Sequence, residues 1–370
     1  MKVKYVLKIL LLIVLAAAFV AGTAYFIGTR MAYSKGETQR FVKQLGAGIN
    51  VGNSLDVYDA DVKEGLFEEA WGNPPLHKDL FKTIRAAGFK TVRIPVSWGD
   101  HVDDGFNVDP AWMSRVHEVV DMALDSGLYV IINSHHEPWR SLVTRNDAWI
   151  RYRNMLLWRQ IAEEFKDYDE RLLFEGMNEP RLIDSEMEWT DGDAGLKGFV
   201  NELNGDFVDT VRATGGKNSD RYLLVTTYAG KATDATVMVL KDFLDERKKD
   251  RRLIASVHMY MPYSFAQDED GTDKWDQENP DDLKDIELGI SSMMILRDAG
   301  YSVMLTEYGA KDKGNDEARI AWATYYAARC NYNGIARIWW DDGSDYALID
   351  REKLVWKNTE LNAIAAYSKE

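Results

Sequence analysis

The segment GLYVIINSHHE, residues 127–137, contains the unit from which the rest of the chain is built. Gly127 ends a helical pattern over Ala111–Ser126, and the apolar run Tyr129–Asn133 has the length and composition of a buried strand. Three polar residues, His135, His136 and Glu137, follow the end of that strand. A helix, a glycine stop, a strand and a polar strand end in this order indicate an α/β protein with parallel strands.

The same order recurs along the chain. The predicted strands are Leu45–Asn50, Thr91–Pro95, Tyr129–Asn133, Leu172–Met177, Tyr222–Thr226, Ile254–His258, Val303–Thr306 and Ile335–Trp339. Helices are predicted over His77–Ala87, Ala111–Ser126, Tyr152–Phe165, Leu196–Thr214, Leu283–Ala299 and Glu317–Tyr332. Eight such units over about 320 residues predict a single (β/α)8 TIM barrel. An open doubly wound sheet is the alternative, but neither GxGxxG nor GxxxxGK[ST] occurs.

The composition excludes several classes of function. The 370 residues include 45 Lys and Arg against 60 Asp and Glu, which gives a net charge of −15. A surface this acidic argues against a nucleic-acid partner, because phosphate binding needs an excess of Lys and Arg. The one cysteine, Cys330, allows no intrachain disulfide and is expected to be buried.

The N-terminus has the features of an export signal. Residues 9–28 carry no charge, and Lys2, Lys4 and Lys8 precede them. A run of about 20 residues is long enough to cross the hydrocarbon core. Two interpretations remain open: an uncleaved signal-anchor helix, or a signal peptide cleaved after the small residues Ala21-Gly22-Thr23-Ala24.

Both interpretations place the remainder of the chain outside the cell, either secreted or tethered to the outer face of the cytoplasmic membrane. The expected organisation is a signal or anchor over residues 1–28, a polar tether over 29–40 and the barrel over 41–370. Membrane contact is expected only through the N-terminal segment. We expect the protein to be a monomer.

Two glutamates occupy predicted strand ends, where barrels carry their chemistry. Glu179 follows the fourth strand and Glu307 ends the seventh. A pair of carboxylates is the minimal equipment for glycoside hydrolysis: one protonates the leaving oxygen, and the other attacks the anomeric carbon or activates water. The two need different pKa values. The structural alternative is that one of them only forms an ion pair with Arg93.

Arg93 lies among apolar residues, and a buried arginine needs an anionic partner. It is expected to hold Glu307 ionised, and Tyr260 can donate to the same carboxylate. A purely structural salt bridge is the alternative. No metal site is predicted at His135 and His136, because adjacent side chains on a regular strand point to opposite faces. Hydrogen bonds to sugar hydroxyls or carboxylates are expected there instead.

Tryptophans near predicted loops are candidate platforms for sugar rings. Trp340 ends the eighth strand beside Trp339, and one of the two should face the barrel mouth. The loop candidates are Trp71, Trp98, Trp139, Trp189 and Trp275. Tryptophans within or near helical patterns are expected in the core: Trp112, Trp149, Trp158, Trp322 and Trp356.

With these residues in their observed order, the chain resembles glycoside hydrolase family 5, especially its bacterial endoglucanase and xyloglucanase branch. The resemblance runs from about Gly46 to Gly343 and includes AWGNP (70–74), VRIPVSW (92–98) and INSHHE (132–137). Further motifs are GINVGNSLD (48–56), FEGMNEP (174–180), VHMY (257–260), TEYG (306–309) and WWDDG (339–343). The last two depart from the family's usual Glu-Phe-Gly or Glu-Trp-Gly and Trp-Asp-Asn-Gly.

The resemblance implies a (β/α)8 barrel and a retaining double displacement, with Glu179 as acid/base and Glu307 as nucleophile. It also implies contacts to the substrate or to the nucleophile. These involve Asn178 at the 2-hydroxyl, Arg93 and Tyr260 at the nucleophile, His135 and His258 at the cleavage point, Trp340 beneath that sugar, and Asn53 and Asp56 at the next sugar. His136 is a further candidate for substrate binding.

The sequence therefore predicts a retaining endo-β-1,4-glucanase that cleaves internal bonds of plant cell-wall polysaccharide without a cofactor or metal. Xyloglucan, mixed-linkage glucan, mannan and xylan are alternative substrates for the same mechanism. A non-catalytic polysaccharide-binding surface protein and a metal-dependent barrel hydrolase are alternatives of other classes.

Overall fold

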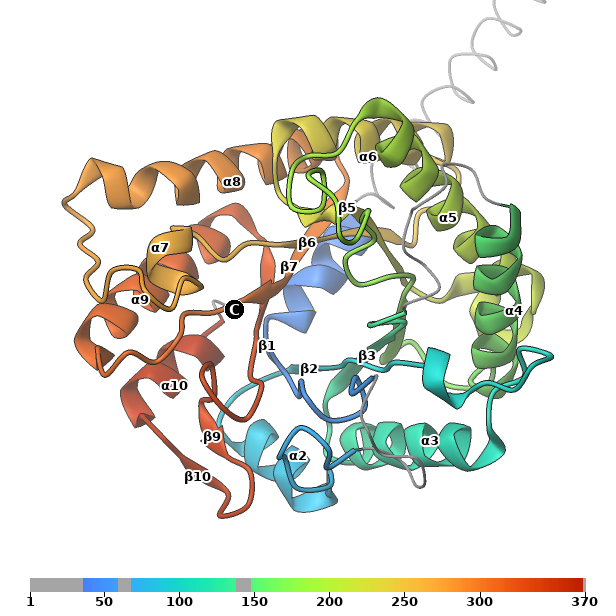
Figure 1. Ribbon diagram of the computed structural model, residues 1–370, viewed down its shortest axis with the longest axis horizontal. Helices are drawn as coiled ribbons and strands as arrows, with labels where there is room; N and C mark the ends of the chain where they lie inside the picture. The colour runs from blue at the N-terminus through green and yellow to red at the C-terminus, as the bar shows by residue number, and fades with distance from the viewer. Residues whose placement is uncertain (1–35, 59–67, 138–147, 369–370) are drawn as a thin grey trace, which may run out of the picture.

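The computed structural model describes residues 36–58, 68–137 and 148–368. Eight parallel strands close into a barrel in sequence order, and β8 pairs with β1 to complete it. Helices surround the barrel in a ring (Figure 1). The predicted single (β/α)8 barrel is confirmed.

The strands that form the barrel are β1 (Ala47–Asn50), β2 (Thr91–Ile94), β3 (Tyr129–Asn133), β4 (Leu172–Glu175), β5 (Leu223–Lys231), β6 (Leu253–His258), β7 (Ser302–Tyr308) and β8 (Ala336–Trp339). The main helices are α2 (Lys78–Ala86), α3 (Pro110–Asp125), α4 (Ala148–Glu164), α5 (Ala194–Ala213), α6 (Asp234–Glu246), α8 (Pro280–Asp298), α9 (Asp316–Asn333) and α10 (Thr359–Ala366). Short elements are α7 (Tyr263–Ala266), η1 (Gly99–His101), η3 (Gly216–Asp220) and the β9–β10 pair (Ile349–Asp350, Val355–Trp356).

The structure extends two strands, β5 and β7, beyond their predicted ends and adds two main helices, α6 and α10, to those predicted. β5 continues past Thr226 to Lys231 through an irregular segment in which Ala229 and Gly230 have positive φ. A positive φ breaks the regular pleat, so apolar alternation does not reveal this extension. α6 starts immediately afterwards with a capping box formed by Thr233 and Thr236.

The interior of the barrel contains two layers of opposite character. The lower layer is apolar and is closed by Phe41, Val42 and Leu45 from a helical segment over residues 36–45. Its strand members are Ile131, Leu173, Leu224, Ile254, Met304 and Ile338. The upper layer is polar and fully buried, and consists of Asn50, Arg93, Asn133, Glu175, Thr226, Ser256 and Thr306. Inward-facing residues recur at every second position of a strand. The polar residues therefore lie two positions further along their strands than the apolar residues, nearer the C-terminal edge of the barrel.

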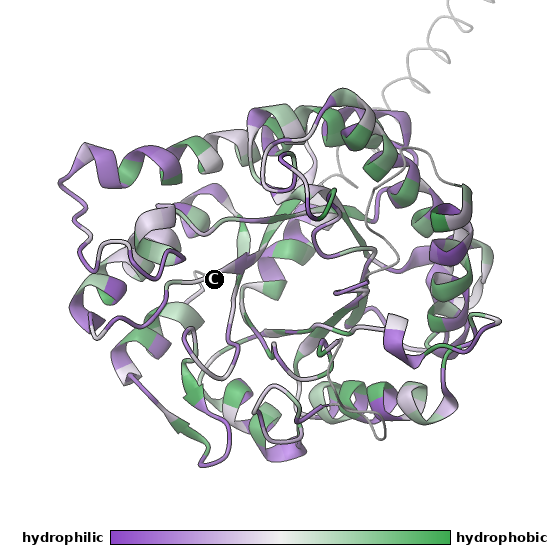
Figure 2. Cartoon of the chain, viewed as in Figure 1, coloured by the Kyte–Doolittle hydropathy of each residue, from purple (hydrophilic) through white to green (hydrophobic). Residues whose placement is uncertain are grey.

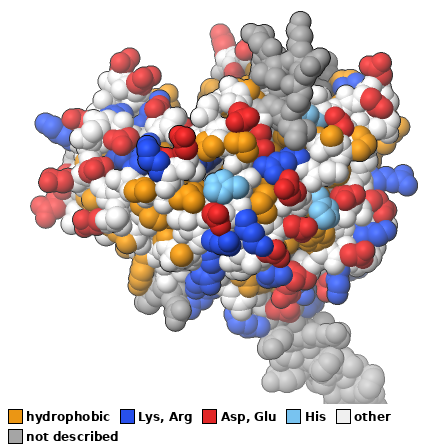
Figure 3. Space-filling view, turned by 90° about the horizontal axis from the view of Figure 1, so that it is seen from below, with side chains coloured by type: hydrophobic (Ala, Val, Ile, Leu, Met, Phe, Trp, Pro, Cys, Tyr) orange, Lys and Arg blue, Asp and Glu red, His pale blue; other side chains and the backbone are white. Residues whose placement is uncertain are grey.

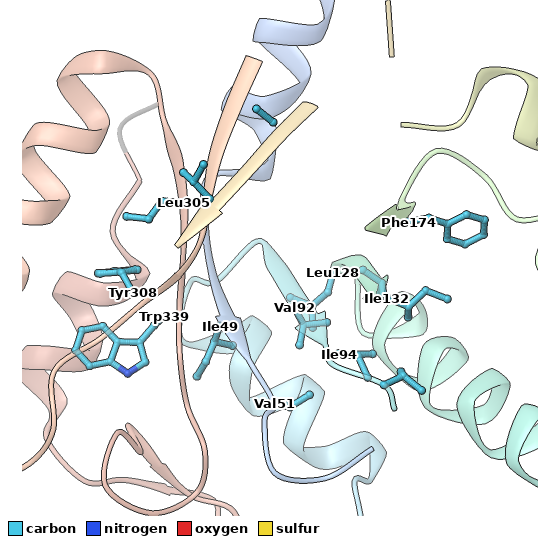
Figure 4. Packing of buried hydrophobic residues seen from close by; sticks show 14 of the residues in the cluster. Ile49, Val51, Val92, Ile94, Leu128, Ile132, Phe174, Leu305, Tyr308 and Trp339 are labelled. Carbon is cyan, nitrogen blue, oxygen red and sulfur yellow. The ribbon is translucent and has the colours of Figure 1, made fainter. Parts of the chain in front are cut away.

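The alternate residues of each strand face outward and pack against the helices. Figure 4 shows this layer, with Ile49, Val92, Ile132 and Phe174 among its members. Hydrophobic colouring runs along the barrel strands, and the surrounding helices carry mixed colouring (Figure 2). The large core beneath the helices therefore holds the strands in place, and the upper layer of the barrel interior can consist of polar groups.

Acidic and basic side chains are interspersed over the face seen in Figure 3 rather than separated into two patches. Cys330 is buried, as predicted. The predicted signal or anchor over residues 1–28 lies outside the described residues, and the helical segment 36–45 begins inside the stretch 29–40 predicted as a tether. Among the residues that the structure describes, no helix has the length and apolar character needed to cross a membrane.

Candidate active site

The C-terminal ends of β2, β4, β6 and β7 bring four charged side chains together: Arg93, Glu179, His258 and Glu307. One ligand atom from each of Glu179, His258 and Glu307 lies within 4.8 Å of the other two. The two glutamates that the sequence placed on the fourth and seventh strands therefore share one site. Their carboxylate oxygens are close enough for both to reach a single glycosidic bond.

Arg93 links the polar layer of the barrel to this site. Its Nε donates to Glu175 at 2.7 Å, and one terminal nitrogen donates to Glu307 at 2.6 Å. The same nitrogen donates to the Asn50 side chain at 2.9 Å, and the other donates to the Asn178 side chain at 2.7 Å. Burial disfavours the charged guanidinium, but the charges of Glu175 and Glu307 raise the pKa of Arg93. Arg93 is thus a permanent cation with fixed geometry.

Glu175 is a second carboxylate on Arg93 that the sequence analysis missed. It is fully buried and also accepts hydrogen bonds from Ser256 at 2.6 Å and from the Asn133 side chain at 3.0 Å. A signal for it exists in FEGMNEP (174–180), where Glu175 occupies an inward position on a strand that is otherwise apolar. Arg93 therefore divides its charge between Glu175 and Glu307.

Glu307 accepts from Tyr260 at 3.0 Å in addition to Arg93. Burial, with the nearby Glu307 charge, raises the pKa of Tyr260 well above its usual value, so the phenol stays a donor. Burial and the neighbouring Glu179 also raise the pKa of Glu307, whereas His258 and Arg93 oppose this rise. Glu307 consequently depends on its cationic and phenolic neighbours to stay ionised.

His258 lies between the two carboxylates. Its Nδ1 is 2.7 Å from Glu179 and 3.4 Å from Glu307. Burial opposes the charged forms of both partners, but the His258 hydrogen bond lowers the pKa of Glu179, and the charges of Glu307 and Glu179 raise that of His258. Both shifts favour an ionised Glu179 that accepts from a protonated Nδ1 of His258. Glu179 has the lower pKa and Glu307 the higher, whereas an acid/base Glu179 and a nucleophilic Glu307 need the opposite order.

A glycine at the end of β5 makes the contact between Glu179 and His258 possible. Gly230 has φ +65°, and a Cβ there would lie 3.1 Å from the His258 ring nitrogen and 3.3 Å from the Glu179 side chain. Any larger residue would combine backbone strain with displacement of the pair. The irregular end of β5 therefore belongs to the site.

Asn133 sets the tautomer of His135. The side-chain oxygen of Asn133, Oδ1, accepts from the Val96 backbone N–H at 3.1 Å, which leaves the side-chain nitrogen to donate to Glu175 and to His135 Nδ1. His135 Nδ1 is then an acceptor, and its proton lies on Nε2. Burial lowers the pKa of His135 well below its usual value, so the ring is neutral and presents one N–H donor.

That donor faces Asp56, whose Oδ2 lies 4.0 Å from His135 Nε2. Asp56 is fully buried, and this Oδ2 has no hydrogen-bond partner among the described residues. Burial raises the pKa of Asp56 to about 6, against lowering by backbone N–H groups. Asp56 Oδ2 is therefore a buried acceptor without a partner among the described residues, beside the buried ring of His135.

The argument that His135 and His136 point to opposite faces was wrong. β3 ends at Asn133, and the two rings, whose centroids are 4.5 Å apart, lie on non-strand backbone. Asp56, His135 and His136 form one group that can approach a metal ion, and Glu179, His258 and Glu307 form another. The first group is a poor donor set because His135 Nε2 carries a proton, and in the second Nδ1 of His258 is committed to Glu179.

Trp340 and Trp339 face different ways, as the alternation predicted. Trp339 is fully buried against the helices and donates to the Tyr346 carbonyl at 2.9 Å. Trp340 is partly exposed and lies parallel to His135, with 5.8 Å between ring centroids. Gly52 permits this position, since a Cβ there would lie 2.5 Å from the Trp340 ring. Asn53, which follows Gly52, has φ 55°, and its backbone carbonyl accepts from the Asn73 side chain at 2.8 Å.

The remaining tryptophans divide differently from the prediction. Trp98 and Trp275 are buried and cannot serve as platforms, and Trp139 lies outside the described residues. Trp71 and Trp189 are exposed, and Trp71 contacts the His136 ring edge-on. Trp112, Trp158 and Trp322 are buried as predicted, and Trp356 is partly buried. Trp149 was predicted in the core but is 48 % exposed, because it lies in the first turn of α4 and stacks on Arg153.

The barrel carries two carboxylates, a histidine and an arginine at the C-terminal ends of its strands. This arrangement is typical of (β/α)8 enzymes with a two-carboxylate centre. Residues 55–345 match the cellulase family, glycosyl hydrolase family 5. The chain belongs to this family, as its motifs indicated.

Two curated relatives and one solved structure illustrate the similarity. Cellulase/esterase CelE of Acetivibrio thermocellus is 38 % identical over 86 % of this chain, and the chain spans 39 % of CelE. Endoglucanase A of Ruminococcus albus is 39 % identical, with 89 % of this chain and 92 % of that protein covered. XEG5A, a xyloglucan-specific endo-β-1,4-glucanase from a metagenomic library, superimposes with a TM-score of 0.84 at 32 % identity over 90 % of this chain and 99 % of that one.

The charge on His258 should make stability depend on pH. Its raised folded pKa means that the stabilisation from its contacts with Glu179 and Glu307 is complete below its ordinary value of 6.5 and is lost as pH rises through the folded value. The Tm difference between the wild type and His258→Asn should therefore be larger near pH 6 than near pH 9. For a barrel of this size each kcal/mol lost corresponds to roughly 1–2 °C.

The matched control is the Glu179→Gln background, in which His258 loses one of its two anionic partners. There the pH dependence of the Tm difference should shrink. A Tm difference that stays constant from acid to alkaline pH would show that His258 is neutral in the folded protein.

Proposed function

We propose that the protein is a retaining endo-β-1,4-glucanase. The observation that carries this proposal is the convergence of Glu179 and Glu307, with oxygens within 4.8 Å of each other. Retaining enzymes place their carboxyl groups about 5–5.5 Å apart, whereas inverting enzymes leave room for a water molecule at roughly 6.5–9.5 Å. The spacing here supports direct attack by one carboxylate.

In the first step Glu307 attacks the anomeric carbon while Glu179 protonates the departing glycosidic oxygen. The proton that Glu179 needs is available on His258, which donates along the 2.7 Å hydrogen bond. Once Glu179 is protonated, its repulsion of Glu307 is gone, and Arg93 and Tyr260 stabilise the ionised nucleophile. Moving this proton to Glu179 gives the ionisation order that the mechanism needs, although the pKa values of the free site favour the proton on His258.

In the second step Glu179, now ionised, takes a proton from water, and the water attacks the glycosyl–Glu307 bond. The product keeps its anomeric configuration, because two inversions occur at one carbon. Asn178 is fixed by Arg93 beside the acid/base and can donate its amide to the 2-hydroxyl. Trp340, which lies parallel to His135, offers an indole platform for one sugar, and Asp56 lies buried behind His135.

The β-1,4-glucan backbone is proposed as the substrate because relatives that match nearly the whole chain are endoglucanases. Xyloglucan, which has the same backbone with side chains, is the second candidate, and the similarity to XEG5A favours it. Neither requires a cofactor in the mechanism above. The chain spans 39 % of CelE, so the proposal does not extend to activities of the remaining part of CelE.

We also propose that the barrel is exported. The uncharged run over residues 9–28, preceded by three lysines, supports this proposal. Sequencing the N-terminus of the cell-produced protein is expected to give either an intact segment with the protein in the membrane fraction or a new terminus near Tyr25. An intact N-terminus on cytosolic protein would contradict export.

Substitution of the two carboxylates tests the proposed mechanism. Glu307→Ala should remove nearly all turnover of soluble β-glucan, with a loss of about 10⁴-fold or more. Glu179→Ala should be impaired by about 10²–10⁴-fold on natural bonds but retain activity on aryl glycosides whose leaving group needs no proton. Glu118→Gln, an exposed glutamate on α3, serves as the control and should keep full activity.

Retained activity in Glu307→Ala would refute its role as nucleophile. The anomeric form of the first product, followed by NMR, provides an independent check. The β-anomer is expected, and the α-anomer would refute retention.

A further inference from the structure

The turn between α6 and β6, residues 247–252, concentrates positive charge in an otherwise acidic chain. Its sequence, RKKDRR, has five cationic residues in six positions, whereas the whole chain has a net charge of −15. In a (β/α)8 barrel a helix-to-strand turn lies at the base, which is the end formed by the N-terminal ends of the strands. The positive turn therefore lies at the opposite end of the barrel from Glu179 and Glu307.

Ion pairs engage acidic side chains near this turn and leave lysines over. Arg252 lies 3.5 Å from Glu37, and Arg212 donates to Asp250 at 2.8 Å. Glu246, which precedes the turn, offsets one further positive charge. The base also carries exposed lysines that form no ion pair among the described residues, and these basal lysines are Lys43, Lys217, Lys248 and Lys249. This part of the base therefore keeps an excess of exposed ammonium groups.

A pocket at the base combines this charge with a buried hydroxyl that lacks a partner. The residues that line it include Thr38, Lys248, Arg251 and Ser302. Ser302 is 2 % exposed, and its Oγ has no hydrogen-bond partner among the residues that the structure describes. Asp250 also lines the pocket, but its carboxylate is already engaged in an ion pair. A buried hydroxyl donor beside ammonium and guanidinium groups suits the oxygens of a phosphate group.

The described part of the chain begins beside this pocket. Residues 36–45 form a helical segment that lies across the centre of the barrel ring (Figure 1). Thr38 donates to the Arg251 backbone oxygen at 2.5 Å, which places the start of this segment against the positive turn. The uncharged run 9–28 is separated from the segment by residues 29–35, and seven residues span at most about 25 Å. With that run held in a membrane, the base lies within about 25 Å of the lipid headgroups.

We propose that the base of the barrel docks on an anionic phospholipid surface through the basal lysines and the pocket beside them. The proposal rests on the proposed export, with residues 9–28 kept as an anchor, and it does not depend on the reaction at Glu179 and Glu307. Docking in this orientation turns the mouth of the barrel, where the two glutamates lie, away from the membrane. The active site is then open to polymer outside the membrane.

Electrostatics favours this orientation over the others. Each lysine close to an anionic membrane strengthens contact by about fivefold, and the effect decays within a Debye length of about 8 Å at physiological salt. The whole chain carries an excess of Asp and Glu, so an anionic membrane repels the remainder of the surface. Contact through the base should therefore depend on both lipid charge and salt.

The test uses the full chain in lipid nanodiscs, where both ends of the barrel remain open to reagents. The discs contain phosphatidylcholine alone or with about 30 % phosphatidylglycerol. Lysines are acetylated with a water-soluble N-hydroxysuccinimide ester and quantified by mass spectrometry. Labelling of Lys43, Lys248 and Lys249 should fall at least about threefold in the anionic discs, and about 0.5 M NaCl should restore it. Lys274, an exposed lysine in the loop between β6 and α8 at the mouth of the barrel, should label equally in both.

Charge reversal separates the base from the net charge of the protein. In Lys248→Glu/Lys249→Glu the protection of Lys43 by anionic lipid should be lost. The matched control, Lys197→Glu/Lys274→Glu, changes the net charge equally at two lysines near the mouth of the barrel and should leave the protection of Lys43 intact. Lys248→Glu/Lys249→Glu should hydrolyse soluble β-glucan at the wild-type rate, because the base is remote from the active site.

Equal labelling of the basal lysines in neutral and anionic discs would overturn the proposal. The same protection from inorganic phosphate in neutral discs would overturn it too, since the pocket would then be a site for a free anion. Loss of Lys43 protection in both double variants, or a mature N-terminus near Tyr25, would have the same consequence. If Lys248→Glu/Lys249→Glu does not fold, Lys248→Gln/Lys249→Gln removes the charges, and the same loss of protection is expected. Failure of the proposed function is separate: the wild type would not hydrolyse β-glucan while its base is still protected.

Discussion

The site depends on one buried cation placed between two buried carboxylates. Arg93 bonds Glu175 on one side and Glu307 on the other, and all three are almost completely removed from water. Each charge alone would cost several kcal/mol to bury, so removing any one of them leaves the others uncompensated. The Asn50 and Asn178 side chains accept from the remaining terminal donors, which fixes the plane of the guanidinium. The position of Glu307 is therefore determined by a network and not by its own strand alone.

This network is possible because the barrel interior changes from apolar to polar between one inward-facing residue of a strand and the next. The lower layer, closed by the helical segment 36–45, excludes water and anchors the strands. The upper layer carries polar groups that satisfy one another: Ser256 and Asn133 bond Glu175, and Asn133 also sets the tautomer of His135. Donors and charges that are oriented before a substrate arrives need no reorganisation during the reaction. His258 adds a proton that it can share with Glu179.

The repeating strand–helix pattern was sufficient to predict the barrel, because parallel strands and crossover helices follow from period and order alone. It also identified most of the candidate site, since polar residues at strand ends must meet at one edge of a parallel barrel. Glu175 escaped because it lies inside the predicted strand Leu172–Met177, where it looks like a single polar interruption of an apolar run, whereas β4 in fact ends at this residue. The contact between His135 and His136 was misjudged because strand alternation was extended past Asn133, where the strand has ended. The exposure of Trp149 and the burial of Trp98 depend on tertiary packing, which no local pattern contains.

The most direct test of this account is the pH dependence of kcat/KM in Glu175→Gln, compared with the wild type and with the surface control Glu118→Gln. Glu175 does not contact Glu307 in any hydrogen bond of the site, and Arg93 is the group that bonds both carboxylates. Removing its charge leaves the whole attraction of Arg93 to Glu307, which lowers the pKa of the nucleophile. The acid limb of the profile, which reports the group that must be ionised, should therefore move to lower pH in Glu175→Gln and stay in place in Glu118→Gln. An acid limb that does not move in a folded Glu175→Gln variant would contradict the claim that Arg93 couples the two carboxylates.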